Sequence, residues 1–70
     1  MSNWPTSRAS RVLAALLRIG WVVKRQTGSH RTLALEGWIN VTFAFHDGDE
    51  IGGRMLAKIA KTTGLRPEDL

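Results

Sequence analysis

The first apolar segment of the chain has the spacing of an amphipathic helix. Its apolar residues recur three or four positions apart, which places them on one face of a helix: Ala9, Val12, Leu13, Leu16 and Leu17. Ser7 is a suitable N-cap, because its hydroxyl can accept a free backbone N–H of the first turn. Gly20 can end the helix in the left-handed conformation that favours glycine. We therefore predict a helix between Ser7 and Gly20.

After this helix the apolar residues alternate with polar ones. Three alternating segments are separated by two short glycine-bearing turns: residues 21–26, 30–35 and 39–45, with turns at 27–29 and 36–37. Alternation of this kind is typical of strands that have one buried and one solvated face. The sequence therefore predicts a three-stranded antiparallel sheet with one apolar and one polar face.

A second helical pattern occupies the C-terminal third. Met55, Leu56, Ile59 and Ala60 recur at helical spacing, and Gly64 can end the helix. The loop 46–50 before it carries three acids, which suit the positive N-terminal end of a helix. The predicted fold is α+β in the order α-β-β-β-α, with both helices on the apolar face of the sheet and the other face open to solvent.

Length and composition limit what this fold can contain. The 70 residues predict a single domain over 1–70, with 1–6 frayed unless Trp4 folds back onto the core. A hydrophobic share of 43% supports one thin layer of helices on a sheet but no deep pocket. With no cysteine and two histidines, a structural zinc is not expected, and no cofactor is predicted. No apolar run is long enough for a membrane span or a signal peptide, so we expect a soluble, cytoplasmic protein.

The positive charge is concentrated in the first half of the chain. Residues 1–35 carry six bases and no acid, whereas residues 36–70 carry four bases and six acids, so that +6 and −2 sum to the net +4. A basic half beside a faintly acidic one favours a polyanion such as nucleic acid as a partner. The charge could instead serve only to keep the domain in solution, so it favours nucleic acid only slightly.

The predicted strand pairing places both histidines at one end of the polar face. A three-residue turn at 27–29 sets Gln26 directly across from His30, and the second hairpin pairs His30 with Ala44. His46 follows just beyond the third strand, at the same edge of the sheet.

Three bases are expected close to these histidines: Lys24, which the same turn sets across from Thr32, Arg25 and Arg31. An imidazole can hold or release a proton near neutral pH, and adjacent cations can stabilise negative charge on a phosphate. RNA supplies its own nucleophile, the 2′-hydroxyl, so its cleavage requires no metal. The alternative is that a histidine on a wet sheet face is an ordinary surface residue.

Other candidate sites have weaker support. Asp47, Asp49 and Glu50 lack the remaining ligands of a calcium loop, and turn formation explains them better. Trp38 could stack on a base at the hairpin tip, although packing at the core or the edge explains it better. Ser29 has no Asp–His pair to activate it as a nucleophile.

An ordered set of short motifs resembles the HicA (YcfA-like) toxins. The motifs are Ile19-Gly20-Trp21, Gln26-Thr27-Gly28-Ser29-His30, Val41-Thr42-Phe43, His46, Glu50-Ile51 and Gly64-Leu65. The most specific piece is Gly28-Ser29-His30 after a basic strand, with His46 at the expected distance. The resemblance runs from about Arg11 to Leu70.

The resemblance implies a fold similar to a double-stranded-RNA-binding domain and a toxin of a type II toxin–antitoxin system. Such a toxin cleaves messenger RNA without a metal and is inhibited by a HicB-type antitoxin protein. His30 falls on the family's catalytic histidine and His46 on its second histidine, in a secondary catalytic or positioning role. Gln26 would orient the imidazole or the RNA, and four residues would bind RNA: Lys24, Arg25, Ser29 and Arg31.

Two segments depart from the family pattern. Ala44 stands in a segment that usually carries a proline before the second histidine, and Arg54-Met55 replaces a Gly-Thr at the start of the last helix. Neither departure touches His30. A non-catalytic RNA-binding module of the same fold is the alternative function, and a pure protein-interaction domain is a third.

Overall fold

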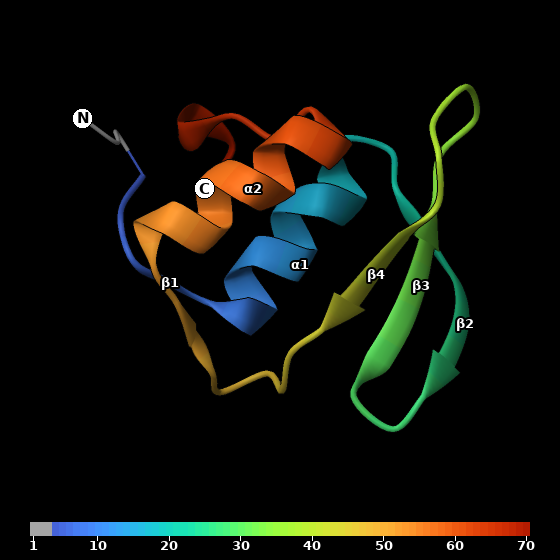
Figure 1. The fold of residues 1–70 in the computed structure, drawn as a ribbon, viewed down its shortest axis with the longest axis horizontal. Coiled ribbons are helices and arrows are strands. Elements are labelled where there is room, and N and C mark those ends of the chain that lie inside the picture. Colours follow the sequence, from blue (N-terminus) through green and yellow to red (C-terminus); the bar gives the residue numbers. More distant parts are fainter. Residues whose placement is uncertain (1–3) are drawn as a thin grey trace.

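The computed structural model describes residues 4–70 and has an α+β fold (Figure 1). In chain order the elements are β1 (Ser7–Arg8), α1 (Ala9–Arg18), β2 (Val22–Thr27), β3 (His30–Ala34), β4 (Val41–Ala44), β5 (Glu50–Ile51), α2 (Gly53–Thr63) and a 3-10 helix, η1 (Pro67–Asp69). The larger elements confirm the predicted α-β-β-β-α order. Similarity to a double-stranded-RNA-binding domain stays a prediction.

The sheet has the predicted antiparallel order β2-β3-β4, with β3 in the centre. Figure 1 shows α1 and α2 together on one side of this sheet, which leaves the opposite face uncovered in the described chain. The strands β1 and β5 form a separate two-stranded pair that joins the start of α1 to the start of α2. These two strands are not predicted, because two residues are too few to show alternation.

The core lies between the two helices and the covered face of the sheet. Leu33 of β3 and Phe43 of β4 are fully buried there. Buried residues from the other elements meet them: Ala9, Val12, Ala15, Leu16, Trp21, Ile51, Leu56, Ile59 and Leu65. Trp4 packs against this cluster, as the sequence allows, while residues 1–3 of the segment expected to be frayed lie outside the described residues.

Trp21 connects the start of β2 to the second helix. Its indole N–H donates to the backbone oxygen of Thr63 at 3.0 Å, and its ring meets that of Trp38 edge to face, with centroids 5.9 Å apart. Gly64 ends α2 in the left-handed conformation, at φ +75°, as predicted. The edge-to-face contact with Trp21 confirms that Trp38 has a packing role.

The cap of the first helix differs from the prediction. Ser7 lies in β1 and donates its hydroxyl to the backbone oxygen of Pro5, so it is not the N-cap. The loop after β4 caps the helix instead: the Ala9 N–H donates to the Asp49 oxygen at 2.8 Å, and the Ser10 N–H to the Asp47 oxygen at 3.2 Å. The acidic loop expected to favour α2 therefore lies against α1, and α2 has no acid in its first turn.

The first hairpin turn is shorter than predicted. Thr27 pairs with His30, so the turn consists of Gly28 and Ser29. Gly28 has a φ of +59° at the first central position, as in a type II′ turn, whose twist suits a hairpin. The second hairpin has the predicted register, in which His30 pairs with Ala44.

Candidate active site

His30 lies at the end of the uncovered sheet face. It is the first residue of β3, directly after the type II′ turn, and its cross-strand partners are Thr27 and Ala44. The buried Leu33 faces the helices, so alternation along β3 places His30 on the opposite face. His30 is exposed, and the predicted solvent access of this imidazole is confirmed.

A β-bulge places two bases on the same face. The β2–β3 register shifts between Val23 and Arg25, which leaves Lys24 as the extra residue. Arg25 pairs with Thr32 and is thus a diagonal neighbour of His30, at a typical separation of about 7–8 Å that a long side chain can span. A shallow hollow of about 290 Å³ is lined by Lys24, Arg25, Thr32 and Asn40. Arg25 therefore lies near His30, as predicted. Lys24 shares the hollow with Arg25 but is not across from Thr32, and His30 does not line this hollow.

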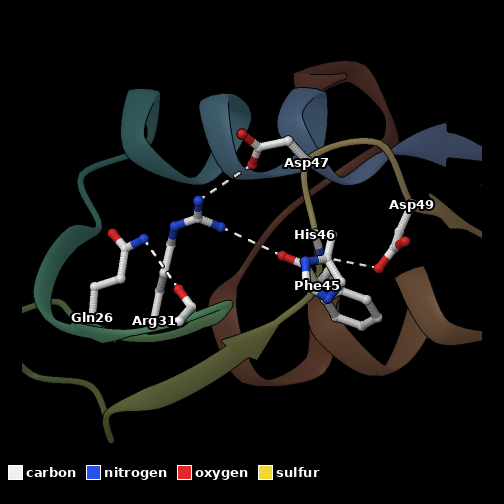
Figure 2. Close-up of polar contacts among 7 residues, drawn as sticks. Gln26, Arg31, Phe45, His46, Asp47 and Asp49 are labelled. Carbon is white, nitrogen blue, oxygen red and sulfur yellow. Dashed lines mark hydrogen bonds and ion pairs between the residues drawn. The ribbon is translucent and has the colours of Figure 1, made fainter.

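Gln26 and Arg31 lie on the other face of the sheet, contrary to the predicted arrangement. They pair with each other, and Arg31 shares the face of Leu33. The Gln26 side-chain amide donates to the backbone oxygen of Gly28 at 3.3 Å (Figure 2). For Gln26 the two-residue turn causes the difference, because shifting the pairing by one residue moves a side chain to the opposite face. Arg31 lies on the face opposite to His30 because consecutive residues of a strand alternate between faces. Gln26 therefore does not lie across from His30.

The Arg31 guanidinium reaches past the end of β4 to the loop that follows it. One terminal nitrogen contacts the Asp47 carboxylate at 3.3 Å and the other the backbone oxygen of Phe45 at 3.5 Å (Figure 2). Only 14% of the Arg31 side chain is exposed, so this cation is already enclosed and paired.

His46 lies in the same loop and at the same end of the sheet as His30. Ala44 is the cross-strand partner of His30, and His46 comes two residues after Ala44. This confirms the predicted placement of His46 at the same end of the sheet. The His46 N–H donates to the Asp49 carboxylate at 2.9 Å, and the Asp49 N–H donates to the His46 oxygen at 2.9 Å. Both histidines are exposed, and within residues 4–70 no side chain or backbone group hydrogen-bonds either imidazole.

Ser29 is half-buried in the turn directly before His30. Its place in the turn brings its hydroxyl to the same end of the sheet as the two imidazoles.

A larger groove lies at the opposite end of β4. It encloses about 590 Å³, and its lining is Gly37, Trp38, Ile39, Asn40, Val41, Thr42, Lys61 and Thr62. Neither this groove nor the smaller hollow is lined by a histidine. The smaller hollow is the better candidate for phosphate binding, because two bases, Lys24 and Arg25, line it and only one, Lys61, lines the larger groove.

Two further observations concern the chain between residues 4 and 70. No three His, Asp or Glu side chains in it gather closely enough to hold a metal ion. Neither α1 nor α2 is long and apolar enough to cross a bilayer.

Sequence reasoning did not find the contacts of Arg31 or the bulge at Lys24. Arg31 and Asp47 are 16 residues apart, and no local pattern pairs them. The alternation of polar and apolar residues along β3 is the signal that predicts Arg31 on the same face as Leu33.

Comparison with known proteins identifies the family. A model of the family described as HicA toxin of bacterial toxin–antitoxin matches residues 9–65. No curated protein and no solved structure matches the chain. The matched segment extends from the start of α1 to Leu65 and includes both His30 and His46. The chain therefore belongs to the HicA toxin family of bacterial toxin–antitoxin systems.

Proposed function

We propose that this protein is an endoribonuclease toxin that cleaves messenger RNA, with His30 as the general acid or base. The observation that carries the proposal is the exposed imidazole of His30 on the uncovered sheet face, diagonal to Arg25. Membership of a toxin family supports a role in arresting growth. The substrate lies in the cytoplasm, which is where the toxin would act.

Cleavage would proceed through the 2′-hydroxyl of the RNA. The 2′-oxygen attacks the neighbouring phosphorus, a base removes the 2′-hydroxyl proton, and the bond from phosphorus to the 5′-oxygen breaks. An acid protonates that 5′-oxygen, so the products are a 2′,3′-cyclic phosphate and a 5′-hydroxyl. His30 supplies one of these proton transfers, and the imidazole of His46 or water supplies the other. No step requires a metal ion.

Two bases on the uncovered face would hold the phosphate. Lys24 and Arg25 line the same hollow, where their charges can neutralise the phosphate and stabilise the charge that develops on it. Ser29, which directly precedes His30 in the turn, would contribute its hydroxyl to the same phosphate. Gln26 and Arg31 contact no RNA in this arrangement, because both lie on the other face of the sheet.

The test compares wild type with His30→Ala on single-stranded RNA in the presence of a chelator. We expect wild type to cleave and His30→Ala to be slower by about 10²–10⁴-fold, the range for loss of a general acid or base. Thr42→Ala is the matched control, because Thr42 is exposed on β4 and alternates with the buried Phe43. Equal cleavage by wild type and His30→Ala, or no cleavage by wild type, would overturn the proposed activity.

A non-catalytic RNA-binding module is the second candidate. The absence of any hydrogen bond that orients the His30 imidazole within residues 4–70 favours it. It requires that His30→Ala bind RNA as tightly as wild type and that no cleavage product form. Lys24→Ala and Arg25→Ala would then weaken binding to all sequences alike and flatten its salt dependence.

A HicB-type antitoxin is the proposed protein partner, on the basis of family membership. Expression of the toxin alone should arrest growth, and co-expression with the protein encoded beside it should restore growth. Growth arrest by His30→Ala as strong as that by wild type would contradict the proposed origin of toxicity.

A further inference from the structure

The loop that carries His46 is held on both sides of that residue. Arg31 contacts the Phe45 oxygen and the Asp47 carboxylate, the two neighbours of His46 along the chain. Asp49 binds the backbone of His46 twice, once through its carboxylate and once through its own N–H. The backbone of His46 is therefore fixed, while its imidazole extends from the loop without a hydrogen bond to residues 4–70.

Arg31 is suited to this task by its position and by its shape. It follows His30 directly on β3 and extends from the opposite face, so one backbone segment positions both an imidazole and a guanidinium. A planar guanidinium offers several donors in a rigid fork, and a single arginine can therefore bind two acceptors at once. Lysine has the same charge but a compact ammonium without this fork.

The enclosure of Arg31 argues against a direct contact with RNA. Its side chain is 14% exposed, whereas that of its partner Asp47 is 68% exposed. A phosphate would have to compete with the Asp47 carboxylate for a guanidinium that is already largely enclosed. Lys24 and Arg25 are exposed in the hollow and need no such displacement.

We propose that Arg31 is a positioning residue that holds the His46 loop against the end of β3 where His30 begins. This rests on the proposed nuclease activity and takes the imidazole of His46, not water, as the group that supplies the second proton transfer. Arg31 contributes to turnover by fixing where His46 lies, and it does not contribute to RNA affinity. Asp47 acts with it as the partner of its guanidinium.

The decisive comparison is between Arg31→Gln and Asp47→Asn. We expect each variant to lower kcat about tenfold, because a small misplacement of a catalytic group slows a reaction strongly, and to leave KM within twofold. The double variant should be no slower than Arg31→Gln alone, because Arg31→Gln already removes the contact with Asp47 together with the contact with the Phe45 oxygen. If Arg31 instead contacted RNA, Asp47→Asn would free the guanidinium and strengthen RNA binding, and Arg31→Gln would weaken binding and flatten its salt dependence. That pattern would overturn the proposal.

Two further variants separate positioning from folding. Arg31→Lys keeps the charge and the aliphatic stem but loses the fork, so it should fold and still show the lower kcat. Arg66→Lys is the matched control, because Arg66 is an exposed arginine with ion pairs to Glu68 and Asp69 and lies outside the loop. A kcat for Arg31→Lys equal to that of wild type would count against the proposal.

Hydrogen exchange tests the loop without requiring any cleavage. Local opening exposes an amide to exchange, so Arg31→Lys should speed exchange of the His46 N–H about tenfold and leave exchange of buried amides such as Leu33 unchanged. Unchanged exchange at His46 would show that Arg31 does not hold the loop. If wild type failed to cleave RNA while His46 exchange still rose in Arg31→Lys, the nuclease activity would fail and the structural role of Arg31 would stand.

Discussion

Neighbouring residues on β3 have opposite surroundings. His30 is exposed on the uncovered face, and its imidazole has no hydrogen bond within residues 4–70, whereas Arg31 is enclosed and bound to two acceptors on the covered side. The same alternation sets Thr32 against Leu33, which is fully buried. Strand alternation therefore divides the residues of β3: one face packs against the helices, and the other exposes His30 to solvent.

The edge strand β2 follows different rules from the central strand. All six of its residues are exposed, so it adds charge to the surface and nothing to the core. Its bulge interrupts the alternation of side chains, and both Lys24 and Arg25 line the hollow as a result. Because no side chain of β2 is buried, a bulge that changes which face its side chains occupy costs little stability. The bulge in β2 therefore allows Lys24 and Arg25 to line the same hollow.

Removing a side chain from the covered face should have the largest effect on stability. Leu33→Ala removes most of a fully buried side chain and leaves a cavity between sheet and helices. We expect a loss of about 2–5 kcal/mol in the free energy of unfolding, a large share of what a domain of this size has. Urea denaturation followed by circular dichroism measures it. A loss below about 1 kcal/mol would mean that the sheet and the helices repack easily.

Substitution of Trp21 tests what holds β2 against the rest of the fold, since no side chain of β2 itself is buried. Trp21→Phe keeps an aromatic ring but leaves the Thr63 oxygen without the indole N–H that now donates to it. We expect a loss of about 1–3 kcal/mol, the cost of an unsatisfied buried acceptor. Trp38→Phe is the control, because Trp38 is about half exposed and makes no hydrogen bond within residues 4–70 that would be lost. Equal losses in both variants would show that ring packing, and not the hydrogen bond, attaches β2.

The difference between the strands also explains what the sequence could predict. The pairing of His30 with Ala44 was correct because apolar residues on both strands, such as Leu33 and Phe43, fix which side chains face the core. The pairing of Gln26 with His30 was wrong because β2 has no buried residue to fix its register. Alternation therefore predicts a pairing only where both strands contribute to the core.

Features that depend on distant parts of the chain were not predictable. Ser7 has the side chain of an N-cap, but the loop after β4 supplies carbonyls to the first amides of α1, and no local pattern indicates this. The ion pair between Arg31 and Asp47 is of the same kind, because it links β3 to a loop 16 residues away. The candidate histidines were located correctly, whereas the contacts that hold one of them were not.

Substitution in the turn between β2 and β3 should have an intermediate effect on stability. This turn determines which side chains of β2 lie on each face of the sheet. Gly28 has a φ of +59° with no atom within 4 Å of an added Cβ, so Gly28→Ala introduces backbone strain without a clash. We expect a loss of about 1–2 kcal/mol in the free energy of unfolding. Gly48→Ala is the matched control, because Gly48 has open space and a φ outside the left-handed region. No loss in Gly28→Ala would mean that the hairpin adopts another turn, and the cross-strand pairs of β2 should then change in NMR spectra.

Substitution of Thr32, the neighbour of Leu33 on β3, should have the smallest effect on stability. Thr32→Val, one position from Leu33, replaces a hydroxyl with a methyl group on the uncovered face and keeps a β-branched side chain suited to a strand. We expect a change within about 0.5 kcal/mol in the free energy of unfolding, as for other substitutions away from the core. The same urea titration measures it, repeated over a tenfold range of protein concentration.

The titrations at different protein concentrations show whether a larger effect of Thr32→Val on stability comes from association of two copies of the chain. If a second copy of the chain covered this face, stability would rise with protein concentration, and Thr32→Val would alter that dependence. A midpoint that is independent of concentration, together with a negligible effect of Thr32→Val, requires that the face beside His30 be open to solvent in the isolated chain. That openness is the condition that the proposed phosphate contacts of His30 and Arg25 require.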